Sequence, residues 1–207
     1  MSAFDSFTNE RKTRSYNHTT RIKVPKERVG VILGRKGSNK DRIEDELGVI
    51  LHVDSSSGDI EITLNSNAED PSKIFKTRDI LTAVGRGFSP EKALKLVDDE
   101  YNLGIIDLRE YFGKSKSDIQ RVKGRVIGKS GKTRHLIEEL TGTDISVYGY
   151  TISIIGESTS FNIAKDSIEM LIRGNQHKTV YQFLHRKRRD VKIEEMELWK
   201  NQQINSN

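Results

Sequence analysis

The hydrophobic positions of the chain change period several times between residues 20 and 88, and each change predicts an element. Short runs in which apolar and polar residues alternate indicate strands, and apolar residues three and four positions apart indicate one face of a helix. Pro25 ends the first strand, and Gly48 stops a polar helix. The predicted elements are a strand at 22–24, helices at 29–33 and 38–47, strands at 51–53 and 60–64, and a helix at 71–88.

The same order of elements returns in the second half of the chain. Gly34-Arg35-Lys36-Gly37 recurs as Gly128-Lys129-Ser130-Gly131, 94 positions later. A bare Gly-x-x-Gly means little in a chain with 16 glycines, but here the surroundings repeat at the same offset. The matched pairs are Gly30 with Gly124, Ile32 with Val126, Leu33 with Ile127, Ile43 with Ile137, Gly48 with Gly142, Leu51 with Ile145, and Val53 with Val147. The chain therefore reads as two copies of one module.

The second copy differs from the first at its start. Its first strand is predicted at 104–108, and an insertion at 109–118 precedes the next helix. Ser115, with Asp118 three residues later, has the spacing of a helix cap. The expected organisation is a disordered arm at 1–18, a first domain at 19–100, a second domain with a C-terminal helix at 101–192, and a tail at 193–207.

Composition narrows the class of protein. Of the 207 residues, 34% are hydrophobic and 31% charged, and no apolar run reaches the roughly 18 residues that span a membrane. The absence of cysteine excludes disulfides, thiolate metal sites and a cysteine nucleophile, and the five histidines have no metal-ligand spacing. The amino terminus lacks the apolar block of a secretion signal. We expect a cytoplasmic monomer without membrane contact, metal or cofactor.

Positive charge is concentrated in two segments. The formal net charge is +5. Residues 113–135 carry eight Lys or Arg against one Asp, and residues 173–192 carry seven against one. One such block is as often a solvated face as a binding surface. The overall basic balance leans toward a polyanionic partner.

Residues 126–133 read Val-Ile-Gly-Lys-Ser-Gly-Lys-Thr, which is similar to the end of an ATP-binding P-loop. A P-loop needs Gly-x-x-x-x-Gly-Lys-Ser/Thr after a strand. Val126 and Lys123 stand where its leading glycine would be, and the apolar residues before the loop have helical spacing. The first copy keeps both glycines without Gly-Lys-Thr. A nucleotide-dependent enzyme is therefore disfavoured, and the dispersed carboxylates argue against a metal-dependent nuclease.

A Gly-x-x-Gly between two helices, preceded by two aliphatic residues, resembles the signature of the type I KH RNA-binding domain. The resemblance implies an α+β fold of two such domains, each a three-stranded antiparallel sheet packed by three helices, with extra C-terminal helices. It implies that each loop clamps the backbone of unpaired RNA beside an apolar groove. The implied RNA-binding residues are Ile32, Leu33, Gly34, Arg35, Lys36, Gly37, Lys40 and Val53 in the first domain, and Val126, Ile127, Gly128, Lys129, Ser130, Gly131, Lys132, Arg134 and Val147 in the second.

Segments 83–96 and 170–190 resemble a narrower group, the tandem-KH assembly factors of the small ribosomal subunit, archaeal relatives of the eukaryotic partner-of-Nob-one protein. This resemblance implies a non-catalytic protein that binds single-stranded RNA near the 3' end of small-subunit ribosomal RNA. It also implies two protein neighbours, the Nob-one endonuclease and the alpha subunit of translation initiation factor two. RNA contact by the first domain stays open, because its loop is intact but the acidic segment 41–46 follows it. The alternative is a scaffold whose KH folds bind protein.

The last thirty residues contain a basic run and a set of apolar side chains, and each of these permits two interpretations. Val180, Phe183 and Leu184 share a helical face that we expect to pack on the second module. The basic run that follows is either a phosphate contact or a solvated surface, and it comprises Arg186, Lys187, Arg188 and Arg189. Ile193, Met196 and Trp199 could enter a partner's groove, but we favour a short helix that folds back on its own domain.

Overall fold

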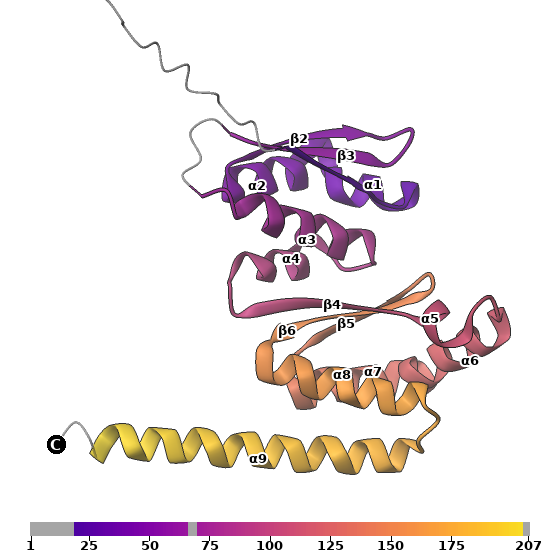
Figure 1. Cartoon of the computed structure of the whole chain (residues 1–207), viewed down its shortest axis with the longest axis vertical. Helices are drawn as coiled ribbons and strands as arrows, with labels where there is room; N and C mark the ends of the chain where they lie inside the picture. The colour runs from indigo at the N-terminus through magenta and orange to yellow at the C-terminus, as the bar shows by residue number, and fades with distance from the viewer. Residues whose placement is uncertain (1–18, 66–69, 205–207) are drawn as a thin grey trace, which may run out of the picture.

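The computed structural model describes residues 19–65 and 70–204, and the expected arm at 1–18 lies outside them. The first module contains β1 (Thr19–Lys23), α1 (Lys26–Leu33), α2 (Ser38–Leu47), β2 (Val49–Asp54), β3 (Asp59–Leu64) and α3 (Lys73–Gly85), as Figure 1 shows. β3 is the middle strand of the sheet and pairs antiparallel with β1 and β2. Ile60 and Ile62 of β3 are fully buried in the core between this sheet and the three helices.

The second module repeats this arrangement and adds two helices, α5 after its first strand and α9 at its C-terminal end. It contains β4 (Tyr101–Asp107), α5 (Leu108–Phe112), α6 (Lys116–Ile127), α7 (Lys132–Thr141), β5 (Asp144–Tyr148), β6 (Thr151–Glu157), α8 (Ser158–Ile172) and α9 (His177–Ile204). β6 is the middle strand between β4 and β5, and both pairings are antiparallel. The predicted α+β fold with two three-stranded antiparallel sheets is therefore confirmed.

Two boundaries in the second module differ from the sequence prediction. β4 begins at Tyr101 and ends at Asp107, not at 104–108. Leu108 starts helix α5 because the Asp107 side chain caps it, accepting a hydrogen bond from the Arg109 amide at 2.9 Å. Most of the predicted insertion is therefore helical. The predicted cap of α6 is confirmed, since the Ser115 hydroxyl accepts a hydrogen bond from the Asp118 amide.

The segment between the two sheets forms two short helices that the periodicity did not predict. They are α4 (Pro90–Ala93) and the 3-10 helix η2 (Leu94–Val97). Ser89 caps α4 through its side chain, and Pro90 occupies the first helical position. Both are start signals for a helix, but they lie just beyond the helix predicted at 71–88, in a stretch for which no element was predicted.

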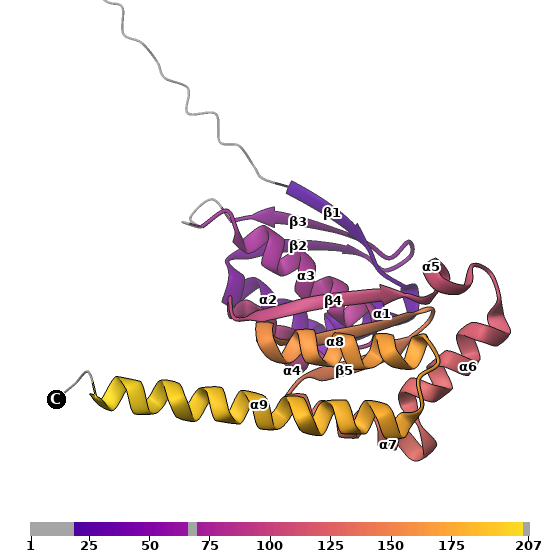
Figure 2. The same cartoon turned by 60° about the horizontal axis from the view of Figure 1, so that its bottom comes forward.

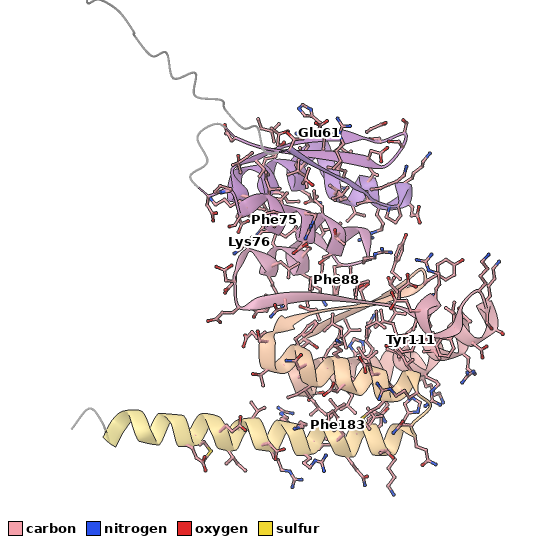
Figure 3. The ribbon with its side chains drawn as sticks, in the orientation of Figure 1. Glu61, Phe75, Lys76, Phe88, Tyr111 and Phe183 are labelled. Carbon is pink, nitrogen blue, oxygen red and sulfur yellow. The ribbon has the colours of Figure 1, made fainter. Side chains whose placement is uncertain are left out.

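The two modules pack through the outer face of the second sheet. β6 is buried on both of its faces, because Ile152 and Ile154 point into their own core while Ile155 joins the core of the first module. Figure 1 shows α3 and α4 above this face. In the described part of the chain, no helix covers the outer face of the first sheet, where Figure 3 labels Glu61, and this face carries charged pairs such as Arg21 with Glu61. Among these residues, the outer face of the second sheet is therefore the one that the contact between the modules buries.

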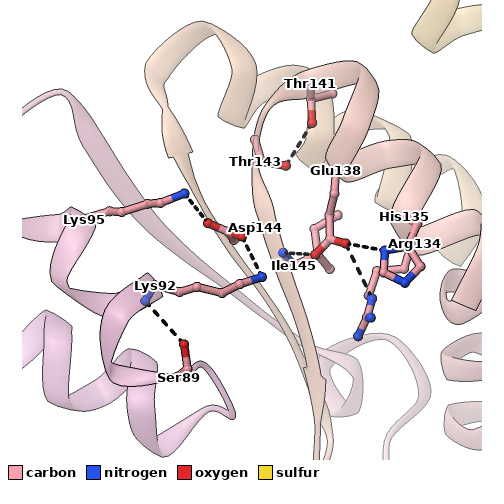
Figure 4. Close-up of polar contacts among 10 residues, drawn as sticks. All are labelled: Ser89, Lys92, Lys95, Arg134, His135, Glu138, Thr141, Thr143, Asp144 and Ile145. Atoms are coloured by element: carbon pink, nitrogen blue, oxygen red, sulfur yellow. Dashed lines mark hydrogen bonds and ion pairs between the residues drawn. The ribbon is translucent and has the colours of Figure 1, made fainter.

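Asp144 at the start of β5 joins the modules electrostatically. Its carboxylate oxygens lie 2.7 Å from Lys92 and 2.7 Å from Lys95 of the first module (Figure 4). Burial opposes ionisation of Asp144, but the hydrogen bonds and charges of the two lysines outweigh it and lower the pKa of this carboxyl below 3.8.

Replacing Asp144 by Asn is expected to lower the free energy of unfolding by about 1–2 kcal/mol at pH 7, because two lysines lose their counter-charge. A lowered pKa stabilises the fold above the ordinary carboxyl pKa, and this contribution disappears as the pH falls through the lowered value. The wild-type and D144N unfolding curves in urea should therefore converge as the pH falls from the ordinary carboxyl pKa through the lowered pKa of Asp144. D59N, which removes half of the exposed pair Lys23–Asp59, is the matched control and should change stability little.

Helix α9 corrects the predicted tail. Val180 and Leu184 are buried in the core of the second module as expected, and Figure 3 shows Phe183 on the side of α9 that faces α8. The helix then continues through residues 192 and 193 without a break, because no glycine or proline interrupts it. Ile193 and Met196 are 55% and 60% exposed, so the predicted fold-back is wrong for these two side chains. The Trp199 side chain lies outside the described residues.

Within the described ranges no helix, α9 included, has an apolar stretch long enough to cross a membrane.

Candidate nucleic-acid interface

The two Gly-x-x-Gly loops have the same backbone conformation. Each forms a single 3-10 turn, η1 (Arg35–Gly37) and η3 (Lys129–Gly131), between the two helices of its module. Lys36 has φ 52° and ψ 27°, and Ser130 has φ 54° and ψ 30°. Among the described residues these two are the only non-glycine residues with positive φ. Backbone held in this sparsely populated region tends to mark functional loops.

The leading glycine of each loop is required by close packing against the next helix. Gly128 has φ 73°, and a Cβ there would lie 2.3 Å from the Thr133 hydroxyl oxygen. Gly34 has φ 72°, and its Cβ would lie 2.7 Å from the Asn39 side chain. Neither the 3-10 turns nor α2 and α7 have a side-chain cap. The start of each second helix can therefore offer amide N–H groups to an anion, as phosphate-binding helix termini do.

The loop is not a P-loop. Helix α6, not a strand, leads into residues 128–133, as the apolar spacing predicted. The Lys132 and Thr133 that suggested a nucleotide site lie on the first turn of α7, where Thr133 is buried. No group of side chains suited to a metal occurs among the residues that the structure describes.

The predicted cations fall into two sets. Arg35, Lys36, Lys129 and Lys132 are exposed, and Ser130 is exposed beside them. Lys40 and Arg134 are instead half-buried and held by a glutamate of their own helix. The first set can meet a ligand freely, whereas the second set is already partly neutralised.

The glutamates Glu44 and Glu138 were missed by the motif search, although they repeat at the same offset as the loops. Glu138 accepts a hydrogen bond from the Ile145 amide at 2.9 Å and lies 3.7 Å from Arg134 (Figure 4). Glu44 accepts one from the Leu51 amide at 2.6 Å and lies 3.0 Å from Lys40. In both modules one carboxylate joins the second helix to the edge strand and holds the cation beside the groove.

The predicted apolar floor needs a correction. Ile32 and Val126 are fully buried, so they support the loop and cannot contact a base. The reason is helical geometry, because adjacent residues of a helix point about 100° apart. Leu33 and Ile127, one residue further along, are half-buried. Val53 and Val147 on the edge strands are also half-buried and can line a groove.

The groove of the second domain has a wall that comes from the first domain. A cavity of about 390 Å³ lies between α7, β5 and the connection between α3 and α4. Residues lining it include Arg134, Glu138 and Val147 of the second domain and Arg28, Ser89 and Lys92 of the first. Hydrogen bonds between the domains hold this wall in place. The Tyr148 hydroxyl donates one of 2.7 Å to the Glu27 carboxylate, and this hydrogen bond lowers the pKa of Glu27. No single-module motif could predict these contributions.

The basic run on α9 begins at Arg186, two residues beyond the buried Leu184. Arg186, Arg188 and Arg189 are exposed, and Lys187 is half-buried. A helix rises about 1.5 Å per residue, so Arg186 lies about 8 Å along the axis from Tyr181, which contacts α7. The basic run therefore lies near the Gly128–Gly131 loop but is not part of it.

Comparison with known proteins agrees with this geometry. Residues 19–81 match the family described as KH domain, and residues 102–189 match the eukaryotic type KH domain, type I. A KH domain-containing protein of Methanocaldococcus jannaschii is 51% identical over 179 residues, covering 86% of this chain and 78% of its own. The pre-rRNA-processing protein pno1 of Schizosaccharomyces pombe is 25% identical over 174 residues, covering 83% and 72%.

A chain in the crystal structure of an a/eIF2alpha–aDim2p–rRNA complex from Pyrococcus horikoshii aligns with a TM-score of 0.80. It is 41% identical, and the alignment covers 86% of this chain and 97% of that one. These relatives share both modules and not only one KH core. The chain belongs to the PNO1/Dim2 family of tandem KH-domain proteins, a family of RNA-binding proteins and not of enzymes.

Proposed function

We propose that this protein clamps single-stranded ribosomal RNA near the 3' end of the small-subunit RNA, mainly through the loop Gly128–Gly131, and acts in maturation of the small ribosomal subunit. The observation that carries the proposal is the strained, uncapped loop with exposed Lys129 and Ser130 at its tip. Phosphates can approach the bare glycines and the amide groups of α7. The names of the relatives, which mention pre-rRNA processing and an rRNA complex, support the choice of RNA.

Bases that follow the clamped phosphates would enter the cavity beside Val147. Half-buried aliphatic side chains give the bases an apolar surface, and Arg134 and Glu138 supply a donor and acceptors at its edge. In the first domain the same loop geometry exists, but the exposed acids Asp41, Asp45 and Glu46 lie on the helix that follows. Repulsion from RNA phosphates makes that loop the weaker site. Lys40 belongs to this weaker site.

The alpha subunit of translation initiation factor two is the protein partner that we propose, because a similar chain occurs in a complex with a/eIF2alpha. The Nob-one endonuclease is a second proposed neighbour, on the family resemblance alone. The run Arg186–Arg189 is proposed as a further phosphate contact, since its arginines are exposed. A scaffold that binds only protein is the competing function.

A salt titration tests the RNA proposal. A KH loop that clamps about four nucleotides should give a slope of log K against log salt near −3, because each neutralised phosphate of a single strand contributes about −0.7. The affinity of a small-subunit 3'-end oligonucleotide would be measured by fluorescence anisotropy between 50 and 300 mM salt (a loss of roughly 100- to 200-fold is expected from this slope). The same sequence in a duplex should bind more weakly. A slope near zero would favour the scaffold.

A further inference from the structure

A second cavity lies on the other side of the Gly128–Gly131 loop, against the C-terminal helix. It has a volume of about 420 Å³ and is closed on one side by His177 and Tyr181 of α9. Arg121, Arg125, Lys129 and Lys132 bring four positive charges to it, and none of the described residues that line it is acidic. Figure 2 shows α9 beginning beside α7, and the residues that line the cavity come from these two helices, α6 and the loop.

Specific hydrogen bonds shape this cavity, so it is not an accidental gap between exposed lysines. Tyr181 and Thr133 share a hydrogen bond of 2.9 Å, and Thr133 is the residue packed beneath Gly128. The Arg125 guanidinium donates to the Leu171 carbonyl, and the Arg125 carbonyl lies 3.0 Å from the His177 ring nitrogen. The contacts of Tyr181 and His177 therefore hold helix α9 next to the Gly128–Gly131 loop.

The first module serves as an internal comparison. At the positions of Arg121, Arg125, Lys129 and Lys132 it has Glu27, Val31, Arg35 and Ser38, whose formal charges cancel. Its counterpart of Thr133 is Asn39 of α2, which donates a hydrogen bond of 2.7 Å to the Val31 carbonyl of the preceding helix α1. The loop backbone is thus the same in both modules, and the basic cavity is particular to the second. Loop geometry alone does not require these four charges.

Gly124 leaves space in the wall of the cavity. It lines the cavity from inside helix α6, and a Cβ at this position would meet nothing within 4 Å. Its counterpart Gly30 has equally open surroundings, so this glycine belongs to the repeated module and does not by itself mark the basic cavity. In the second module, the missing side chain lets a ligand in the cavity approach the backbone of α6 closely.

We propose that this cavity holds a second phosphate of the bound RNA strand, next to the phosphate at the Gly128–Gly131 loop, with Arg121 as its mobile cation. The proposal rests on the RNA binding proposed above and extends it. Arg121 is suited to the role because its side chain is 59% exposed. Among the residues that the structure describes, it pairs with the exposed Asp118, which is a weak competitor for a phosphate. Arg125 is committed to carbonyl groups and shapes the cavity.

Two variants test the proposal without touching the loop. R121A should weaken binding of the small-subunit 3'-end oligonucleotide about threefold to tenfold and reduce the magnitude of the salt slope by about 0.7, the value for one single-strand phosphate. G124A should weaken binding several-fold by filling the cavity, while thermal unfolding shows a stability equal to or above that of the wild type. K165A, which removes an exposed charge from α8, should change neither quantity.

Neutral methylphosphonate linkages locate the phosphate. With one phosphodiester replaced at a time, the wild type should lose affinity at the loop linkages and at one neighbour, and R121A should lose sensitivity at that neighbour alone. An unchanged slope and linkage profile in R121A would overturn the cavity proposal. A second result would also overturn it: R121A loses binding of inorganic phosphate while the salt slope of RNA binding stays unchanged. The cavity would then bind a free phosphate and not a phosphate of the RNA strand. If K129D/S130D leaves RNA affinity intact, the proposed clamp at the Gly128–Gly131 loop fails. The linkage profile of R121A still shows separately whether the cavity holds a phosphate of the RNA.

Discussion

Replacing Lys129 and Ser130 together by Asp (K129D/S130D) is expected to weaken binding of a single-stranded 3'-end oligonucleotide by about 10- to 100-fold, which corresponds to about 1.4–2.8 kcal/mol. One cation is removed and two anions are placed where phosphates approach the loop. The fold should tolerate the change because both side chains are exposed. Position 130 has φ 54°, and Asp is one of the few residues that accept this conformation.

The matched control is R35D/K36D, the same pair of positions in the first module. Its loop has the same dihedral angles, including φ 52° at Lys36, so any backbone effect of the substitution is reproduced. We expect a loss of threefold or less, since the acidic face of α2 already makes this loop the weaker site. Affinity would be measured by anisotropy at 100 mM salt and stability by thermal melting (about 1 kcal/mol of change at most is expected for exposed positions).

The results for the two variants distinguish an RNA clamp from a protein-binding scaffold. A large loss in K129D/S130D alone supports a clamp in the second domain, and equal losses would mean that both loops hold RNA. A loss confined to R35D/K36D would reverse the assignment of the domains. If neither variant affects RNA binding while the alpha subunit of initiation factor two still binds, the scaffold is the better description.

The elements that repeat were predictable because their causes are local. Two glycines in left-handed conformations, Gly48 and Gly142, end α2 and α7, and hydrophobic residues recur at helical or alternating spacing between such stops. The two copies also corrected each other, because a feature present in only one of them, such as Gly-Lys-Thr, could be set aside. The paired loops and their basic tips were found in this way.

What the sequence did not predict depends on contacts between distant residues. Ile155 sits in a strand that reads as one alternating pattern, and only the packing of the modules shows why both of its faces are apolar. Ser89 and Lys92 reach the groove of the other domain for the same reason. The basic cavity needed the course of α9, whose Tyr181 meets Thr133 across 48 residues of sequence. Periodicity carries no information on such pairings.

Replacing Gly128 by Ala is expected to lower the free energy of unfolding by about 2–6 kcal/mol. Gly128 has φ 73° and ψ 175°, a backbone region that is essentially confined to glycine and costs another residue about 1–3 kcal/mol, and relief of an overlap in a packed site costs about 1–3 kcal/mol. The new Cβ would lie 2.3 Å from the Thr133 hydroxyl and 2.8 Å from the Thr133 amide nitrogen. Because the second contact is with backbone, a side-chain rotation cannot relieve it. RNA affinity should fall as well, since the loop must open to make room.

Gly124, four residues earlier, is the matched control for stability. Its Cβ has open space and its φ is not in the left-handed region, so G124A should keep or raise the unfolding midpoint, by up to about 1 kcal/mol in free energy. Urea unfolding of both variants, with the slope compared to confirm the same transition, measures the difference. Equal midpoints for G128A and G124A would show that the loop relaxes freely around a side chain. In that case close packing against Thr133 would not be what keeps glycine at position 128, and the approach of the RNA backbone alone would have to explain it.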